Sequence, residues 1–149
     1  MSQYSSLWFK TFLETVPVEQ TEKEIDFIVR VLPRPRYDRV LDLCCGEGRH
    51  SHALAALGYD VTGVDCNESV IEIARTKPGH AQFVVGDTRD VGKLGGTFDA
   101  VICLWQSFGD FDAATNENVI SQIGISLAPA VASSLISITV DSSKNIRAR

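Results

Sequence analysis

The chain lacks the marks of secreted, membrane and nucleic-acid-binding proteins. Its first 16 residues contain no basic region followed by an apolar core, so we expect no secretory signal. Residues 118–140 carry no charge, but Ser, Gln and Pro interrupt them too often for a membrane span. A net charge of −5 without a basic stripe argues against nucleic acid and anionic membranes as partners. We therefore expect a cytoplasmic protein that binds neither.

A regular spacing of cysteines, which would indicate disulfide bridges, is also lacking. The four cysteines show no regular spacing, and Cys44 and Cys45 are adjacent, so they predict no disulfide framework. Neighbouring side chains on a strand point to opposite faces, which argues against a metal site built on this pair. We predict no metal ion. The four thiols are expected to be small, mostly buried side chains.

What is present is the composition of one ordinary globular domain. The 149 residues can bury one core and are too few for two typical domains. Hydrophobic residues make up 44% and charged residues 22% of the chain, which is typical of folded soluble proteins. No internal repeat or low-complexity segment interrupts it. We expect a single domain over residues 1–149.

An alternation of strands and helices predicts the fold. A helix behind the capping-box sequence Thr21–Glu24 should end before Pro33. The expected strands are residues 39–43, 60–65, 81–85 and 98–104, and the expected helices between and after them are residues 49–57, 68–76 and 116–127. This order predicts an α/β fold, a Rossmann-like, doubly wound parallel sheet in three α/β/α layers. Before it, the spacing of Trp8 and Phe12 would put both on one face of a short helix, which we expect either to pack on the core or to cover a pocket.

Polar residues follow each expected strand at its carboxyl end, where doubly wound sheets bind ligands. They are Asp42 to Gly48, Asp65, Gly86 to Thr88, and Trp105 to Gly109. The first group surrounds a glycine turn that opens a helix, and such a turn presents backbone N–H groups to a ligand. The topology should gather these four segments at one place.

Three carboxylates among these residues narrow the choice of ligand. After Gly46 and Gly48 the third glycine of a dinucleotide fingerprint is missing. Asp65 can accept hydrogen bonds from both hydroxyls of a ribose. Asp42 would repel a pyrophosphate but favours an amino group and a sulfonium, and Asp87 lies where an adenine amine needs an acceptor. A cationic nucleoside therefore suits the site better than a dinucleotide.

At these residues the sequence resembles the class I S-adenosylmethionine-dependent methyltransferases of the small-molecule type. VLDLCCGEGRH is similar to their glycine-rich first motif, VTGVD to the ribose-binding motif, VVGDTRD to the adenine turn and FDAVICLWQSFG to the fourth motif. The resemblance covers about residues 18–112. It implies a helical segment over 1–37, a donor-binding core over 38–128, and S-adenosyl-L-methionine as cofactor with S-adenosyl-L-homocysteine as product.

The resemblance also implies a set of cofactor-binding residues. Lining the methionine end would be Asp42, Cys44, Gly46 and Gly48; Asp65 and its neighbour Cys66 would lie at the ribose, Asp87 and Thr88 at the adenine, and Leu104 beside the sulfonium. Cys44 stands where many members have a glycine. Each aspartate has an alternative role as a helix cap or turn residue. His50 and His52 are expected to be surface or packing residues, and Trp105, Phe108 and Phe111 either core or a substrate wall.

The sequence names no catalytic base. Methyl transfer from a sulfonium needs alignment and exclusion of water more than proton transfer. The absence of an Asn-Pro-Pro-Tyr run after the fourth strand argues against adenine or glutamine amines as acceptors, so a small molecule is expected. Two alternatives remain: a module that binds S-adenosylmethionine without turnover, and an NAD-type oxidoreductase domain.

The tail over residues 129–149 departs from the family pattern. The resemblance implies seven strands, whereas this chain holds material for about five, and no Pro-Gly-Gly turn precedes the fifth. One G inserted after the Pro129 codon allows a back-translated reading of LAPGGRFILDLYHRRFFEEHQ from Leu127, which restores that turn. We hypothesise a one-base frameshift of a longer methyltransferase. An unfinished sheet would leave an exposed edge, through which we expect a homodimer.

Overall fold

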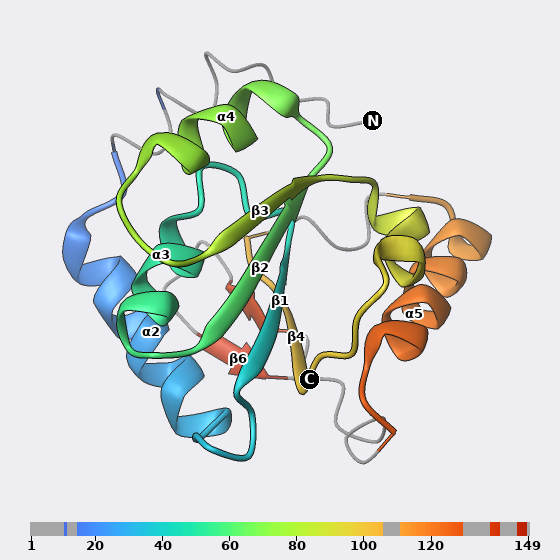
Figure 1. Ribbon diagram of the computed structural model, residues 1–149, viewed down its shortest axis with the longest axis horizontal. Helices are drawn as coiled ribbons and strands as arrows, with labels where there is room; N and C mark the ends of the chain where they lie inside the picture. The colour runs from blue at the N-terminus through green and yellow to red at the C-terminus, as the bar shows by residue number, and fades with distance from the viewer. Residues whose placement is uncertain (1–10, 12–14, 106–110, 130–137, 141–145, 149) are drawn as a thin grey trace.

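The computed structural model describes residue 11 and residues 15–105, 111–129, 138–140 and 146–148 (Figure 1). Its elements are α2 (Val18–Val31), β1 (Arg39–Leu43), α3 (Arg49–Ala56), β2 (Asp60–Asp65), α4 (Glu68–Thr76), β3 (Gln82–Val85), the 3-10 helix η1 (Thr88–Leu94), β4 (Ala100–Cys103), α5 (Ala113–Ser126), β5 (Ile138–Val140) and β6 (Ile146–Ala148). Within this part of the chain, no helix combines the length and apolar character needed to cross a membrane.

The central sheet has the predicted doubly wound topology. Its four strands run parallel in the order β3-β2-β1-β4. The chain moves from β1 outward to β3 and then returns to the other side of β1 with β4, so the order reverses beside β1. The carboxyl end of β1 is therefore the topological switch point, where α/β sheets bind ligands.

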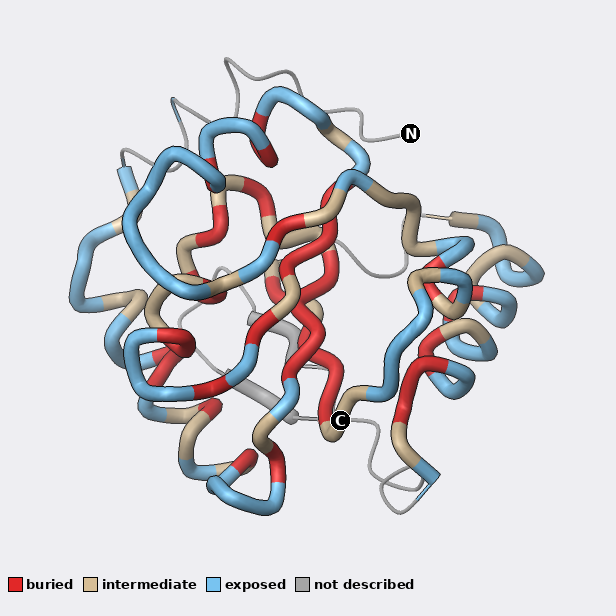
Figure 2. Tube along the Cα trace, in the orientation of Figure 1, coloured by how far each residue is buried: buried red, intermediate tan, exposed pale blue. Residues whose placement is uncertain are grey.

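Helices cover both faces of this sheet. In Figure 1, α2, α3 and α4 lie on one side of the strands and η1 and α5 on the other. Side chains of one strand alternate between the faces, since Val40 joins the core under α2 and α3 whereas Leu41 joins the core under α5. The strands run through the most buried part of the molecule (Figure 2). The Rossmann-like α/β fold is confirmed.

Element boundaries differ from the sequence prediction where side chains took other roles. Helix α2 begins at Val18 after Pro17, so Thr21 lies inside the helix and the predicted capping box is wrong. Helix α5 begins at Ala113 because the Asp112 carboxylate caps it, accepting from the Thr115 N–H at 3.1 Å. Strands β3 and β4 are shorter than expected. The 3-10 helix η1 had no apolar period long enough to predict it.

An isolated parallel bridge lies just before β4 in the chain. Phe98 and Leu127 form a parallel bridge, in which the Phe98 N–H donates to the Ser126 carbonyl and the Ala128 N–H to the Phe98 carbonyl, both at 2.8 Å. The later strand-like segment does not continue this pairing in the described residues, because β5 pairs antiparallel with β6 in a separate sheet. The chain thus follows a parallel α/β plan as far as Ala128.

Candidate functional site

The strand register brings the ends of β1 to β4 to one level. Leu43 of β1 pairs with Val64 of β2 and with Cys103 of β4, and Asp65 pairs with Val85 of β3. Segments that follow these residues therefore meet at the same edge. The sequence prediction that four separate segments gather at the carboxyl ends is confirmed for their described parts.

The turn after β1 takes a backbone path that glycine favours. Cys44, Gly46 and Gly48 have φ angles of 57°, 54° and 75°, in the left-handed region. Cys44 thus adopts the conformation that a glycine would take without strain. A Cβ on Gly48 would lie 2.6 Å from the ring of Phe83, so this position also lacks room for a side chain. The turn ends at Gly48, the N-cap of α3.

Asp65 ties the glycine turn to the end of β2. One carboxylate oxygen accepts from the Gly46 N–H at 3.0 Å, and the other accepts from the Asn67 N–H at 2.9 Å. The side chain is buried, yet a carboxylate has about four acceptor sites, so the contacts with described residues leave two of them unused. Asn67, rather than Asp65, caps α4 through the Ser69 N–H. The alternative role of Asp65 as the cap of that helix is therefore wrong.

Asp42 is buried on the α3 side of β1. Its Oδ2 accepts a hydrogen bond from the Ser51 hydroxyl at 2.6 Å. Burial raises the pKa of Asp42, because desolvation outweighs the attraction of His50 and Arg49 and the hydrogen bond from Ser51. The nearby carboxylate of Asp65 raises it further. A ligand that brings a positive charge to Asp42 would offset this cost of ionisation.

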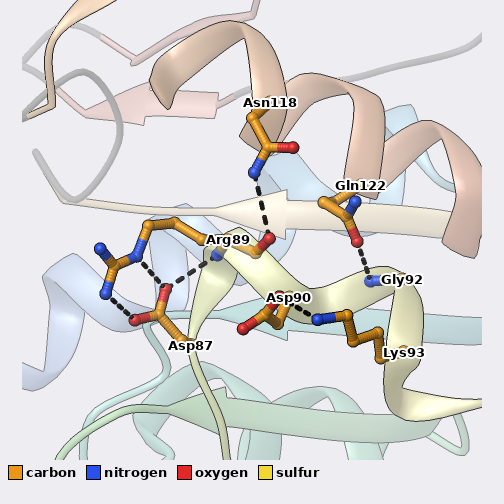
Figure 3. Close-up of polar contacts among 7 residues, drawn as sticks. All are labelled: Asp87, Arg89, Asp90, Gly92, Lys93, Asn118 and Gln122. Atoms are coloured by element: carbon orange, nitrogen blue, oxygen red, sulfur yellow. Dashed lines mark hydrogen bonds and ion pairs between the residues drawn. The ribbon is translucent and has the colours of Figure 1, made fainter. Parts of the chain in front are cut away.

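Asp87 and Thr88 begin η1 directly after β3, as Figure 3 shows for Asp87. Asp87 is the N-cap and accepts from the Arg89 N–H at 2.8 Å. The Arg89 guanidinium also donates to both carboxylate oxygens, at 2.9 and 2.5 Å. These hydrogen bonds lower the pKa of Asp87 to about 2. Asp87 is therefore an ionised carboxylate with a fixed orientation.

The remaining predicted site residues differ in exposure. Cys66 is exposed beside Asp65, whereas Leu104 is buried in the core that includes α2 and α3. Trp105 packs against that same core, and Phe111 packs against the core under α5. Phe108 lies outside the described residues. So do Trp8 and Phe12, and with them the predicted N-terminal cover.

Sequence reasoning missed a buried polar cluster between α2 and α3. Glu24, only 1% exposed, accepts from His50 Nε2 at 2.7 Å and from Gln20 at 2.8 Å, and it pairs with Arg49 at 3.1 Å. Arg49 also donates to the Thr21 hydroxyl at 2.6 Å. The available signal was the position of Glu24 four residues before Ile28, on the apolar face of α2.

This cluster places charged groups beside the glycine turn. Burial opposes the ionisation of Glu24, but hydrogen bonds from His50 and Gln20 and the charge of Arg49 outweigh it and lower its pKa. His50 is thus a buried partner of Glu24, and His52 packs 4.9 Å from the Phe83 ring. The expectation of a packing role therefore holds for His52, whereas His50 forms a buried hydrogen bond that the sequence did not predict. Arg49 also lies 5.2 Å from the ring of Trp105 and so links α3 to the segment after β4.

The donor set does not suit a metal ion. Among the residues that the structure describes, no group of three or more His, Cys, Asp or Glu side chains could hold one. The four cysteines are free thiols. Burial raises the pKa of the Cys45 thiol far above its usual value, with the carboxylates of Asp42 and Asp65 adding to the effect. Carboxylates and backbone N–H groups around a glycine turn are instead suited to a ligand with hydroxyl and amino groups.

Both the sequence and the fold are similar to those of known proteins. A family model described as a methyltransferase domain matches residues 40–130. A putative methyltransferase, YqeM, from Bacillus subtilis strain 168 is 39% identical over 76 residues, which cover 49% of this chain and 31% of that protein. The chain therefore spans about a third of the length of this relative.

Among the solved structures that share the fold are two with known sources. The PH0226 protein from Pyrococcus horikoshii OT3 has a TM-score of 0.70 and 26% identity, over 91% of this chain and 66% of that one. CalS10 from Micromonospora echinaspora, an amino pentose methyltransferase with S-adenosylmethionine bound, has a TM-score of 0.69 and 22% identity, over 97% of this chain and 61% of that one. An identity of 22% to CalS10 shows a shared fold and nothing further about function.

Proposed function

Because the chain belongs to the methyltransferase domain family, we propose that it binds S-adenosyl-L-methionine and transfers its methyl group to a small-molecule acceptor. The observation that carries this proposal is the pair of buried carboxylates, Asp42 and Asp65, on either side of the glycine turn at the switch point. An ammonium and a sulfonium compensate this negative charge, and a ribose fits the acceptor sites left on Asp65.

The residues present fit such a cofactor. The backbone at Gly46 and Gly48 carries no side chain, so a ligand can approach it closely. A side chain at Gly48 is excluded in any case, because its Cβ would collide with the ring of Phe83. Asp42 would hold the amino group, Asp65 the ribose hydroxyls and Asp87 the adenine amine. Cys44, Cys66, Thr88 and Leu104 complete the proposed set. A pyrophosphate would meet Asp42 with unfavourable charge, which disfavours an NAD-type cofactor.

Bound S-adenosylmethionine would supply a methyl group already activated by the positive sulfur. The residues of this chain need only orient the donor, align the acceptor and exclude water. Asp42 and Asp65 would fix the donor from two sides of the turn. We propose no described side chain as a base. The acceptor would then be a group that is nucleophilic without deprotonation, such as a neutral amine. CalS10, which shares the fold, is an amino pentose methyltransferase.

The chain spans only part of its relatives, so turnover is a separate question from donor binding. Residues 38–128 hold every proposed donor contact. We propose cytoplasmic localisation and a single domain. Binding of the donor without transfer to any acceptor would favour the alternative, a binding module without activity.

The test is calorimetric titration of the chain with S-adenosylhomocysteine. We expect saturable binding that is lost in Asp65→Ala, whereas Asp60→Ala should bind as the wild type does. Asp60 is a matched control because it lies at the exposed, opposite end of the same strand, β2. Circular dichroism must show that both variants are folded. No binding by the wild type, or full binding by Asp65→Ala, would refute the proposal.

A further inference from the structure

The Asp87 carboxylate is engaged by one residue only among the contacts in Figure 3. The backbone N–H and Nε of Arg89 both donate to Oδ1, at 2.8 and 2.9 Å, and a terminal guanidinium nitrogen donates to Oδ2 at 2.5 Å. Oδ1 therefore accepts two hydrogen bonds and Oδ2 one. Because each carboxylate oxygen has two acceptor positions, the described residues leave one position unused, on Oδ2.

Arg89 is itself held at both ends. Its backbone carbonyl accepts from the Asn118 side chain of α5 at 3.1 Å, and its guanidinium lies 5.7 Å from the ring of Phe111. The 3-10 helix is also fixed to α5 by the Gly92 N–H, which donates to Gln122 at 3.2 Å (Figure 3). The guanidinium fork is rigid and planar, so it sets the plane of the carboxylate as well as its place.

We propose that Arg89 is a positioning residue that turns the Asp87 carboxylate into a reader of the 6-amino group of adenine, so that the donor site rejects a 6-oxo purine. The inference rests on the proposed function, because it places adenine at Asp87. The free position on Oδ2 can accept one N–H, which adenine offers at its 6-amino group. Hypoxanthine carries an oxygen there, and its lone pairs would face an ionised carboxylate.

The ionisation of Asp87 supports this selectivity. Its pKa of about 2 keeps the carboxylate an acceptor at every physiological pH, so it never donates a proton to a 6-oxo group. The pair is partly exposed, with 29% of the Asp87 side chain and 47% of the Arg89 side chain accessible. It therefore contributes little to folding stability, and its substitution should leave the fold intact.

The test compares two ligands, S-adenosylhomocysteine and S-inosylhomocysteine, by calorimetry on the full chain. We expect the wild type to prefer the 6-amino ligand by about 10- to 100-fold, the range for a hydrogen bond to a charged group. Arg89→Leu should reduce this preference by about tenfold. Arg89→Lys retains the positive charge but lacks the planar guanidinium, so its preference for the 6-amino ligand should lie between those of Arg89→Leu and the wild type.

Lys93→Leu is the matched control. Lys93 lies in the same 3-10 helix and forms a similar exposed ion pair, with Asp90 at 2.7 Å. Lys93→Leu therefore removes one positive charge from η1 and adds one leucine, as Arg89→Leu does. The control should keep the wild-type preference. A merely structural role of Arg89 would weaken both ligands equally, and this result would overturn the inference.

Tighter binding of both ligands by Arg89→Leu would also overturn it, because the ion pair would then compete with adenine. Failure of the proposed function looks different. In that case the wild type binds neither ligand, and Arg89 variants have nothing to alter. Binding that is lost in Asp65→Ala, with a preference unchanged in Arg89→Leu, would leave the function standing and refute the role of Arg89.

Discussion

Removal of the Glu24 carboxylate is expected to destabilise the chain more than any ordinary surface substitution. The side chain is 1% exposed and holds His50, Arg49 and Gln20. Loss of one partner from a buried pair costs about 3–5 kcal/mol. Arg49 is 20% exposed and keeps Thr21 as an acceptor, whereas His50 is left buried, so Glu24→Ala should lie near the lower limit, about 3 kcal/mol.

The assay is urea denaturation followed by circular dichroism at neutral pH. Glu24→Ala should lower the midpoint without changing the denaturant slope. Glu22→Ala makes the same substitution at an exposed position of the same helix and should stay within about 0.5 kcal/mol of the wild type. Glu24→Gln keeps the shape and part of the hydrogen bonding, so its cost should be about 1–2 kcal/mol.

The pH dependence gives a second check on this reasoning. Glu24 has a folded pKa below its value of 4.5 in the unfolded chain, although burial acts in the opposite direction. The carboxylate therefore contributes stability that is complete above that value and is lost as pH falls through the folded pKa. The stability difference between wild type and Glu24→Gln should shrink over this acid range. A Glu24→Ala variant within about 1 kcal/mol of the wild type, or a difference independent of pH, would refute the argument.

Four further outcomes are expected. Affinity for S-adenosylhomocysteine should fall as pH drops from neutral toward about 4, because Asp42 has a raised pKa and must ionise to hold an ammonium group; calorimetry that shows constant affinity would contradict this. Gly48→Ala should abolish donor binding or destabilise the chain by at least about 1 kcal/mol, since its φ is 75° and a Cβ meets Phe83 at 2.6 Å; a variant equal to wild type in both assays would be inconsistent with that crowding. Sequencing the gene should find a family-like reading frame after the Pro129 codon in another register, and an open frame without one would exclude the frameshift. Light scattering at high concentration should detect a homodimer formed through the edge at β4, the last strand of the parallel sheet, and a strict monomer would count against it.

The strand-helix alternation was readable because it depends on local pattern. Strands β1 and β2 and helix α4 have the predicted bounds, since apolar runs end at Asp, Gly or Pro residues that stop each element. The aspartates after the strands followed from topology alone. The hydrogen-bond partners of Asp42 and Asp87 could not be predicted in this way. Ser51 and Arg89 reach these carboxylates through side-chain orientations that no sequence pattern encodes.

The role of Glu24 and the pairing of residues near Pro129 could not be predicted from the sequence and are seen only in the structure. A glutamate in a helix is usually exposed to solvent. Only the packing of α2 on α3 shows that the Glu24 carboxylate is buried against His50 and Arg49. The isolated Phe98–Leu127 bridge is a single parallel pairing just before the point where the sequence pattern breaks, outside the four strands of the parallel sheet. The family model likewise matches as far as residue 130.

The ring of Phe83 couples positions that lie far apart in the chain. It is the atom group that a Cβ on Gly48 or on Gly63 would meet, at 2.6 and 2.8 Å respectively. The size of one side chain in β3 thus limits the size of residues in the glycine turn and in β2. Because Cys45 Sγ would also lie 2.9 Å from a Cβ at 63, a larger residue there should be accepted only after both residues 83 and 45 have changed, so the order of substitutions along a lineage is constrained.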